Sequence, residues 1–337
     1  MMLSRLPRRS YTYAETPIER LDRLTDLLDG PNIYIKRDDL LGLAGGGNKT
    51  RKLEFLIADA LEKGADTIVT CGALQSNHCR LTLAAAVKEG LKCQLVLEEG
   101  PSTSYDADAN GNNLLYNLLG VEHIKVVENG TNVIEEMNIL GEELIASGRK
   151  PYLIPIGGSN VLGSVGYAAC AQEILHQTFK SGLVIDHVVV ASGSGGTQAG
   201  LIAGFHGNSA SVKVSGINVS RSNEHQIPVI QDLVQKTAKF LNVPFTISED
   251  SVNCYDDYVG GGYTIPTDGM IEAVQMLART EGILLDAVYT GKVMAGLIDL
   301  VRQGKFAKDE NVLFIHTGGS PSLYANHTLF NKDLFKI

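Results

Sequence analysis

The sequence has no excess of positive charge, because 38 acidic residues outnumber 29 basic ones and the formal net charge is -9. Binding to nucleic acid or to an anionic membrane needs a cationic face that neutralises phosphate groups. We therefore expect neither as a partner. No apolar run approaches the ~20 residues that cross a bilayer, and there is no tandem repeat or low-complexity tract, which excludes solenoid and linker architectures.

The five cysteines include no C-x-x-C pair, so they predict neither a disulfide framework nor a zinc site. We expect no metal and a reducing compartment. Arg5, Arg8 and Arg9 precede the first acidic residue, as in a transit peptide, but Pro7 and the missing apolar h-region argue against that interpretation. A cytoplasmic location is the favoured expectation.

The residues that are present are typical of an α/β protein. Hydrophobic residues make up 44% of the 337 positions, charged residues make up 20%, and 36 glycines are spread along the chain. A chain of this length exceeds one compact core of usual size, so it predicts two lobes with a cleft between them.

Short apolar runs alternate with stretches of helical periodicity, which predicts parallel strands buried in open, doubly wound sheets. The pattern predicts a small α/β domain over 52–160, and a larger domain formed by 1–51 and 161–337. The expected strands lie at 67–70, 94–97, 124–127, 152–154, 188–190, 214–217 and 312–315, and the expected helices at 51–63, 80–89, 132–147, 197–206 and 271–279.

A run of three glycines, 45–47, comes just before Lys49 and the helical run that follows it. Glycines let the backbone approach a bound group, and Lys49 and Lys52 would share one helix face. The motif offers an amine for covalent chemistry and a second cation beside it. It does not have the spacing of a Walker A loop. A solvated basic helix start is the structural alternative.

A second glycine-rich turn follows the predicted strand at 188–190 and opens a helix. Such a turn surrounds an anion with free backbone amides at the positive end of the helix dipole, and phosphate is the expected guest. Gln198 stands where a dinucleotide-binding motif has its third glycine, which disfavours a dinucleotide as the ligand. A flexible turn is the alternative. The residues concerned are Ser194, Gly195, Gly196 and Thr197.

Three further motifs lie where loops follow strands or helices. Ser76, Asn77 and His78 follow the strand at 67–70 and present hydroxyl, amide and imidazole groups, although helix capping explains the first two equally well. Tyr263 follows three glycines in a loop able to close over a substrate, or in a plain hinge. The last motif has two parts. One is Tyr289, alternatively an ordinary interface tyrosine, followed by Thr290, and the other is the turn at 316–319, which contains Thr317.

Taken together and in this order, the motifs resemble the fold type II, tryptophan-synthase-like pyridoxal-phosphate (PLP) enzymes, and specifically the 1-aminocyclopropane-1-carboxylate (ACC) deaminase and D-cysteine desulfhydrase family. The resemblance runs from about residue 6 to residue 324. It implies a two-domain fold of open twisted sheets flanked by helices. It also implies PLP as cofactor, a small amino acid as substrate and a homodimer.

The resemblance also assigns roles to residues. Lys49 would hold the cofactor as a Schiff base and move protons, assisted by Tyr289. Asn77 would bond the phenolic oxygen of the cofactor, and Ser76 and His78 would face the substrate carboxylate. Tyr263 and Tyr289 match active-site tyrosines of the family. The cofactor phosphate would be held by Lys52, Ser194, Gly195, Gly196 and Thr197.

Two positions bear on the reaction. Members that open the cyclopropane ring have Glu where Thr290 stands, beside the pyridine nitrogen, and Leu where Thr317 stands. A neutral hydroxyl leaves that nitrogen largely unprotonated, which suffices when a good leaving group departs from Cβ. The expected activity is therefore D-cysteine desulfhydrase. L-cysteate sulfo-lyase, ACC deaminase and a non-catalytic PLP or amino-acid binding module remain as alternatives.

Overall fold

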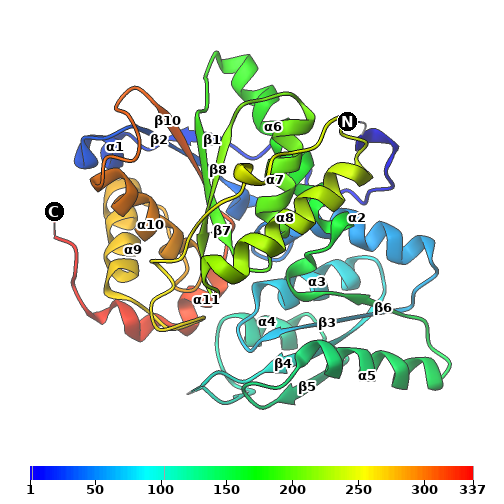
Figure 1. The fold of residues 1–337 in the computed structure, drawn as a ribbon. Coiled ribbons are helices and arrows are strands. Elements are labelled where there is room, and N and C mark those ends of the chain that lie inside the picture. The colour runs from blue at the N-terminus through cyan, green and yellow to red at the C-terminus, as the bar shows by residue number, and fades with distance from the viewer. Residues whose placement is uncertain (2, 102, 337) are drawn as a thin grey trace.

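The computed structural model describes residues 1, 3–101 and 103–336, which form two sheets with helices on both faces of each (Figure 1). The larger sheet has the strand order β1-β2-β10-β7-β8-β9. Neighbouring strands run parallel except for β1 and β2, which pair antiparallel. The strands are β1 (Ile18–Arg20), β2 (Asn32–Lys36), β7 (His187–Ser192), β8 (Lys213–Asn218), β9 (Asn253–Tyr255) and β10 (Asn311–Ile315).

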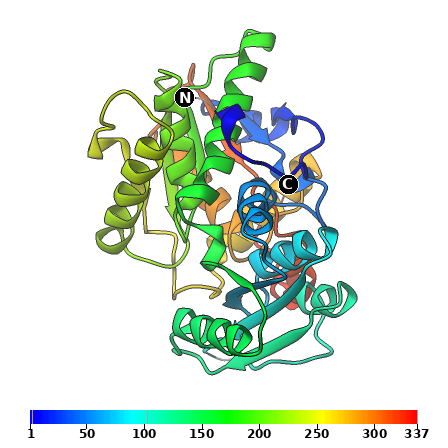
Figure 2. The ribbon, with the colours of Figure 1, turned by 90° about the vertical axis from the view of Figure 1, so that its right-hand side faces the viewer.

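The smaller sheet is entirely parallel, in the order β5-β4-β3-β6. Its central strands bury both faces, as expected of apolar runs flanked by helices. Turned by 90°, this unit, coloured cyan to green, still lies below the larger one (Figure 2). The strands are β3 (Thr67–Ala73), β4 (Lys92–Glu98), β5 (His123–Val127) and β6 (Pro151–Ile154).

Helices cover both faces of each sheet and enclose the apolar cores. On the larger sheet, α1 (Asp22–Leu28), α9 (Asp268–Glu281) and α10 (Thr290–Arg302) pack on one face. The other face carries α6 (Val161–Ser181), α7 (Gly196–Gly207) and α8 (Asn223–Phe240). On the smaller sheet, α5 (Val133–Ala146) covers one face, and α2 (Lys49–Glu62), α3 (Asn77–Lys88) and α4 (Asn112–Leu118) lie on the other. The short α11 (Ser320–Ala325) follows β10.

This architecture confirms the predicted fold class, and every strand predicted from the sequence is present. The first fifty residues contribute β1 and β2 to the larger sheet. The antiparallel β1 departs from the all-parallel expectation. Three short strands (β1, β2 and β9) and six helices (α1, α4, α6, α8, α10 and α11) were not predicted. The domain boundaries at residues 51/52 and 160/161 remain a prediction.

Within the described parts of the chain, no helix is both long enough and apolar enough to span a bilayer. The same residues contain no cluster of His, Cys, Asp or Glu able to hold a metal ion. All five cysteines are free thiols.

Candidate active site

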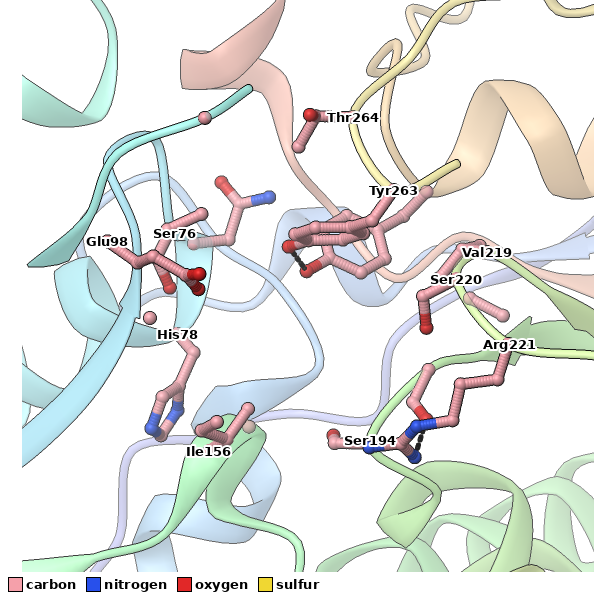
Figure 3. A pocket seen from close by; sticks show the side chains of 18 of the residues that line it. Ser76, His78, Glu98, Ile156, Ser194, Val219, Ser220, Arg221, Tyr263 and Thr264 are labelled. Carbon is pink, nitrogen blue, oxygen red and sulfur yellow. Dashed lines mark hydrogen bonds between the residues drawn. The ribbon is translucent and has the colours of Figure 1, made fainter. Parts of the chain in front are cut away.

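A cavity of about 500 Å³ lies where the carboxyl ends of strands from both sheets meet (Figure 3). Its wall includes residues at or just after the ends of β3, β4, β7, β8 and β10, together with the start of α2 and the loop before α9. Ligands of open α/β sheets bind at this edge, because loops there lead into helix N-termini. The site therefore combines two sheets rather than one.

The cavity wall brings together most of the residues predicted from the sequence. The predicted residues that line it are Lys49, Ser76, Asn77, His78, Ser194, Gly195, Thr197, Tyr263, Tyr289 and Thr317. Lys52, Gly196 and Thr290 are not part of the wall. The first two lie directly behind it, whereas the side chain of Thr290 is bonded elsewhere, as described below.

Lys49 is the first residue of α2, and its Nζ donates to Asn48 Oδ1 at 3.1 Å. Asn48 is itself fixed, because its Nδ2 donates to Thr197 Oγ1 at 2.9 Å. Burial lowers the pKa of the Lys49 amine from 10.5 to about 8, and the negative charge of Asp286 acts in the opposite direction. A lysine with such a pKa is partly neutral near physiological pH, as a nucleophilic amine must be.

The N-terminus of α7 forms one side of the cavity and is open to an anion. Its N-cap is Gly195, with φ of 94°, which has no side chain with which to cap the helix. A residue with a side chain is strained at that backbone angle, whereas glycine is not. The uncapped amides and the positive helix end suit a phosphate.

A lysine and two serines extend this anion site. Ser194 and Ser159 share a hydrogen bond of 2.7 Å between their hydroxyls, and Ser159 Oγ accepts from the Gly196 amide at 3.1 Å. Lys52 Nζ donates to Ser159 Oγ and to the Gly157 carbonyl, both at 3.0 Å. Burial, and then the charge of Lys49, hold the Lys52 pKa well below its usual value. A bound anion would compensate this cost.

Ser159 and Gly157 were not identified from the sequence. A signal was present, because Gly157-Gly158-Ser159 follows the strand predicted at 152–154 and precedes a helix. This is the same strand, glycine turn and helix order that marked the Ser194 motif.

Ser76 and Asn77 combine the two roles between which the sequence left a choice. Ser76 is the N-cap of α3, and its Oγ accepts from the Cys79 amide at 3.1 Å, so its hydroxyl hydrogen remains able to donate. Asn77 Oδ1 accepts a hydrogen bond from Asn112 Nδ2 at 2.9 Å. The Nδ2 group of Asn77 therefore remains able to donate to a ligand. Both side chains cap or brace the helix and also offer donors to the cavity.

His78 lies in the wall, but other groups occupy its ring nitrogens. Nε2 is 2.7 Å from Thr70 Oγ1, and Nδ1 is 3.4 Å from Thr82 Oγ1. The Thr70 hydroxyl donates to the Ile154 carbonyl, so His78 Nε2 acts as the donor in its pair. Burial, with the charges of Lys49 and Lys52, lowers the His78 pKa well below 6.5. The His78 ring is therefore neutral, and its nitrogens bond to Thr70 and Thr82 rather than being available to a substrate carboxylate.

Tyr263 and Tyr289 both line the cavity, and their hydroxyls are hydrogen-bonded to each other, as the dashed line beside Tyr263 marks in Figure 3. Their rings are edge-to-face, with centroids 5.9 Å apart. Burial raises the pKa of Tyr263 to about 12 and that of Tyr289 well above 10. Both phenols therefore keep their protons at neutral pH and can donate them.

Thr290 does not reach the cavity wall, because Asp286 engages its side chain. Its Oγ1 donates to Asp286 Oδ1 at 2.6 Å and accepts from the Asp286 amide at 2.8 Å. Asp286 is fully buried and also accepts from the amides of Val288, Tyr289 and Thr290 at 2.8–2.9 Å. Sequence reasoning missed Asp286, although an isolated acid in the apolar run Ile283–Val288 was an available signal.

The turn that contains Thr317 connects β10 to the start of α2. The Thr317 carbonyl accepts from the Asn48 amide at 3.0 Å. His316 Nε2 lies 2.9 Å from the Leu284 carbonyl, and its Nδ1 accepts from the Gly318 amide, which defines a neutral ring that donates through Nε2. Burial lowers the pKa of His316, in agreement with that state.

The site as a whole suits a phosphorylated aldehyde. Lys49 supplies the amine, the start of α7 with Ser194 supplies the anion site, and Asn77 supplies a donor between them. These features fit the class of α/β enzymes that bind such a cofactor through a lysine.

A family model described as "Pyridoxal-phosphate dependent enzyme" matches residues 9–318, and the chain belongs to this family. Its cofactor is PLP. A crystal structure described as that of an ACC deaminase homologue is 38% identical, with a TM-score of 0.88 and coverage of 99% of this chain and 98% of that one. The structure of an O-ureido-L-serine synthase is 20% identical, with a TM-score of 0.65 over 95% and 93% of the two chains, and this similarity shows the fold alone.

Proposed function

We propose that this chain is a PLP-dependent β-elimination lyase that converts D-cysteine and water to pyruvate, hydrogen sulfide and ammonia. The observation that carries the proposal is the state of Thr290 and Asp286. The hydroxyl of Thr290 replaces a carboxylate, and the buried carboxylate behind it already accepts four hydrogen bonds. No free carboxylate stands at this position to protonate a ring nitrogen, which favours a reaction with a good leaving group.

The residues of the chain supply binding and proton transfer. Lys49 would hold the cofactor, which when bound supplies the electron sink that acidifies the Cα–H bond. Lys49 Nζ, released when the substrate amine takes its place on the cofactor, would take the proton from Cα, as its lowered pKa permits. Ser76 and the first amides of α3 orient the substrate carboxylate. The Tyr289 hydroxyl holds a proton for the departing hydrosulfide.

Charges around the cavity also bear on the substrate. Glu98 lies in the wall formed by the smaller sheet, and Arg221 lies on the opposite side (Figure 3). Glu99, the residue after Glu98, also lines the cavity. The two carboxylates would repel a second anionic group, such as the sulfonate of L-cysteate, whereas Arg221 would attract it. Because two negative charges face one positive charge, a neutral thiol side chain is favoured.

ACC deaminase is the second candidate, because the neighbour that is 38% identical is described as an ACC deaminase homologue. The two reactions share the amine, the anion site and the tyrosine pair. They differ in the bond that breaks, and therefore in the need for a strongly withdrawing cofactor ring.

The test is to measure pyruvate and 2-oxobutyrate release from D-cysteine, L-cysteate, L-cysteine and ACC side by side. We expect D-cysteine to have the highest kcat/KM. Lys49→Ala should abolish turnover of every substrate, while Lys63→Ala, an exposed lysine at the end of the same helix, should not. Thr290→Glu combined with Thr317→Leu should raise the activity with ACC relative to D-cysteine.

Other results would overturn the proposal. A preference for L-cysteate or ACC would show that D-cysteine is not the substrate. Bound cofactor without turnover of any of the four amino acids would favour a non-catalytic binding module. We further propose, from the resemblance and the free thiols, that the protein is a cytoplasmic homodimer.

A further inference from the structure

One face of α10 packs against the loop that places Tyr263 in the cavity wall. Lys292, Gly296 and Asp299 lie at positions i, i+4 and i+7 and so share this face. Asp299 Oδ2 accepts from the Tyr258 hydroxyl at 2.8 Å. A Cβ added at Gly296 would lie 3.0 Å from the Tyr258 ring, so the helix and the loop are in close contact there.

Lys292 makes the contact nearest to the cavity. Its Nζ donates to the carbonyls of Val259 and Gly262 at 2.7 and 2.8 Å, and the residue is fully buried. Lys292 takes part in none of the ion pairs found among the described residues. Burial lowers its pKa to about 8. A buried cation without a paired anion lowers the stability of the fold, so an apolar residue at this position would give a more stable fold.

Within residues 256–266, the backbone hydrogen bonds are those from the Val259 amide to the Asp256 carbonyl and from the Ile265 amide to the Gly262 carbonyl, each 3.2 Å long, so the Lys292 contacts add to a sparse set. Gly260, Gly262 and Thr264 all have positive φ, of 65°, 134° and 65°. Gly262 comes directly before Tyr263, whose hydroxyl bonds Tyr289 at the start of α10. The same helix therefore contacts the loop just before Tyr263, and the residue at its start bonds the Tyr263 side chain itself.

We propose that Lys292 is a positioning residue that sets the place of Tyr263 in the cavity by tying the carbonyls of Val259 and Gly262 to α10. It acts through Tyr263 and touches neither substrate nor cofactor. The inference rests on the proposed function only in taking this cavity as the active site, and not on the identity of the amino acid.

The first readout is hydrogen exchange of the segment 256–266 in the purified holoenzyme. Lys292→Met should speed exchange in this segment by at least about tenfold, since hydrogen bonds to charged groups are the stronger kind. Lys292→Arg, which can still donate to both carbonyls, should restore most of the protection. Lys305→Met, an exposed lysine just beyond α10, is the matched control and should change nothing.

The second readout is a double-mutant cycle of Lys292→Met and Tyr263→Phe on kcat/KM, with the best substrate of the four. If Lys292 acts through Tyr263, the double variant should lose little more than Tyr263→Phe alone. Fully additive losses, or unchanged exchange of 256–266 in a folded Lys292→Met protein, would overturn the inference. Should Lys292→Met not fold, Lys292→Gln takes its place. Because exchange does not depend on turnover, failure of the proposed function leaves this readout intact.

Discussion

The reactivity of Lys49 depends on two opposing influences. Burial lowers the pKa of its amine to about 8, and the charge of Asp286 raises it. Asp286 in turn is held by backbone amides at the start of α10. A charge that sequence reasoning overlooked thus sets how much of the amine is neutral at a given pH.

Asp286→Asn should lower the pKa of Lys49 further, because it removes the nearby negative charge that raises this pKa. The amine then becomes neutral at lower pH. The rate at which cofactor-free protein takes up PLP should show this, because its rise with pH should have a midpoint shifted downward. Asp59→Asn, on the exposed side of α2 and bonded to Tyr152, is the matched control. An unchanged midpoint would contradict the role of Asp286.

Much of the site could be predicted at the level of single residues, because its members occur in short contiguous motifs at strand ends. Lys49 and Ser194 are examples. Asp286, Ser159 and Lys292 escaped prediction because their importance lies in contacts across many residues, such as that between Lys292 and Val259. The neutral, fully bonded state of the His78 ring was equally invisible, since Thr70 and Thr82 determine it.

At the scale of elements, a buried ionic network joins α2 to α6 and to the segment after β2. Arg51 donates to both carboxylate oxygens of Asp38 at 2.8 Å, and to Glu173 at 2.8 and 2.9 Å. Burial acts to raise the pKa of Asp38, but Arg51 and Lys36 lower it overall, below 3.8. This contribution to stability is therefore present above about pH 3.8 and is lost as pH falls through the depressed pKa.

Arg51→Met should destabilise the protein by about 3 to 5 kcal/mol, because it leaves the buried Asp38 carboxylate without its main partner. Urea unfolding at pH 7 should measure this loss. On the same helix, Lys63→Met removes an exposed pair with Asp59 and should cost less than about 1 kcal/mol. Equal losses in the two variants would show that the network does not stabilise the fold.

The helix α6 shows why some elements could not be predicted. It contains Gly163 and Gly166, which have low helix propensity. A Cβ on Gly166 would lie 2.3 Å from the Arg51 carbonyl, so glycine is needed there for α2 and α6 to cross closely. The close packing of α2 against α6 explains why glycine occupies position 166, and no local sequence pattern reveals such packing. Strands β7 and β10, by contrast, each contain a continuous apolar run and were predicted.

At the scale of the whole molecule, the resemblance predicts two copies of the chain per particle. Light scattering of the purified protein coupled to size exclusion should give twice the chain mass of 36.2 kDa. The value should hold on dilution into the micromolar range, as expected of a permanent interface. A mass equal to one chain would contradict the prediction.

The bond between Lys52 and the Gly157 carbonyl lies where the chain enters and leaves the four-stranded unit. Lys52 thus ties the first turn of α2, which precedes β3, to the segment between β6 and α6. The same ammonium borders the candidate anion site through Ser159. Any change in its contact with an anion would therefore also change the contact between these two segments of the chain.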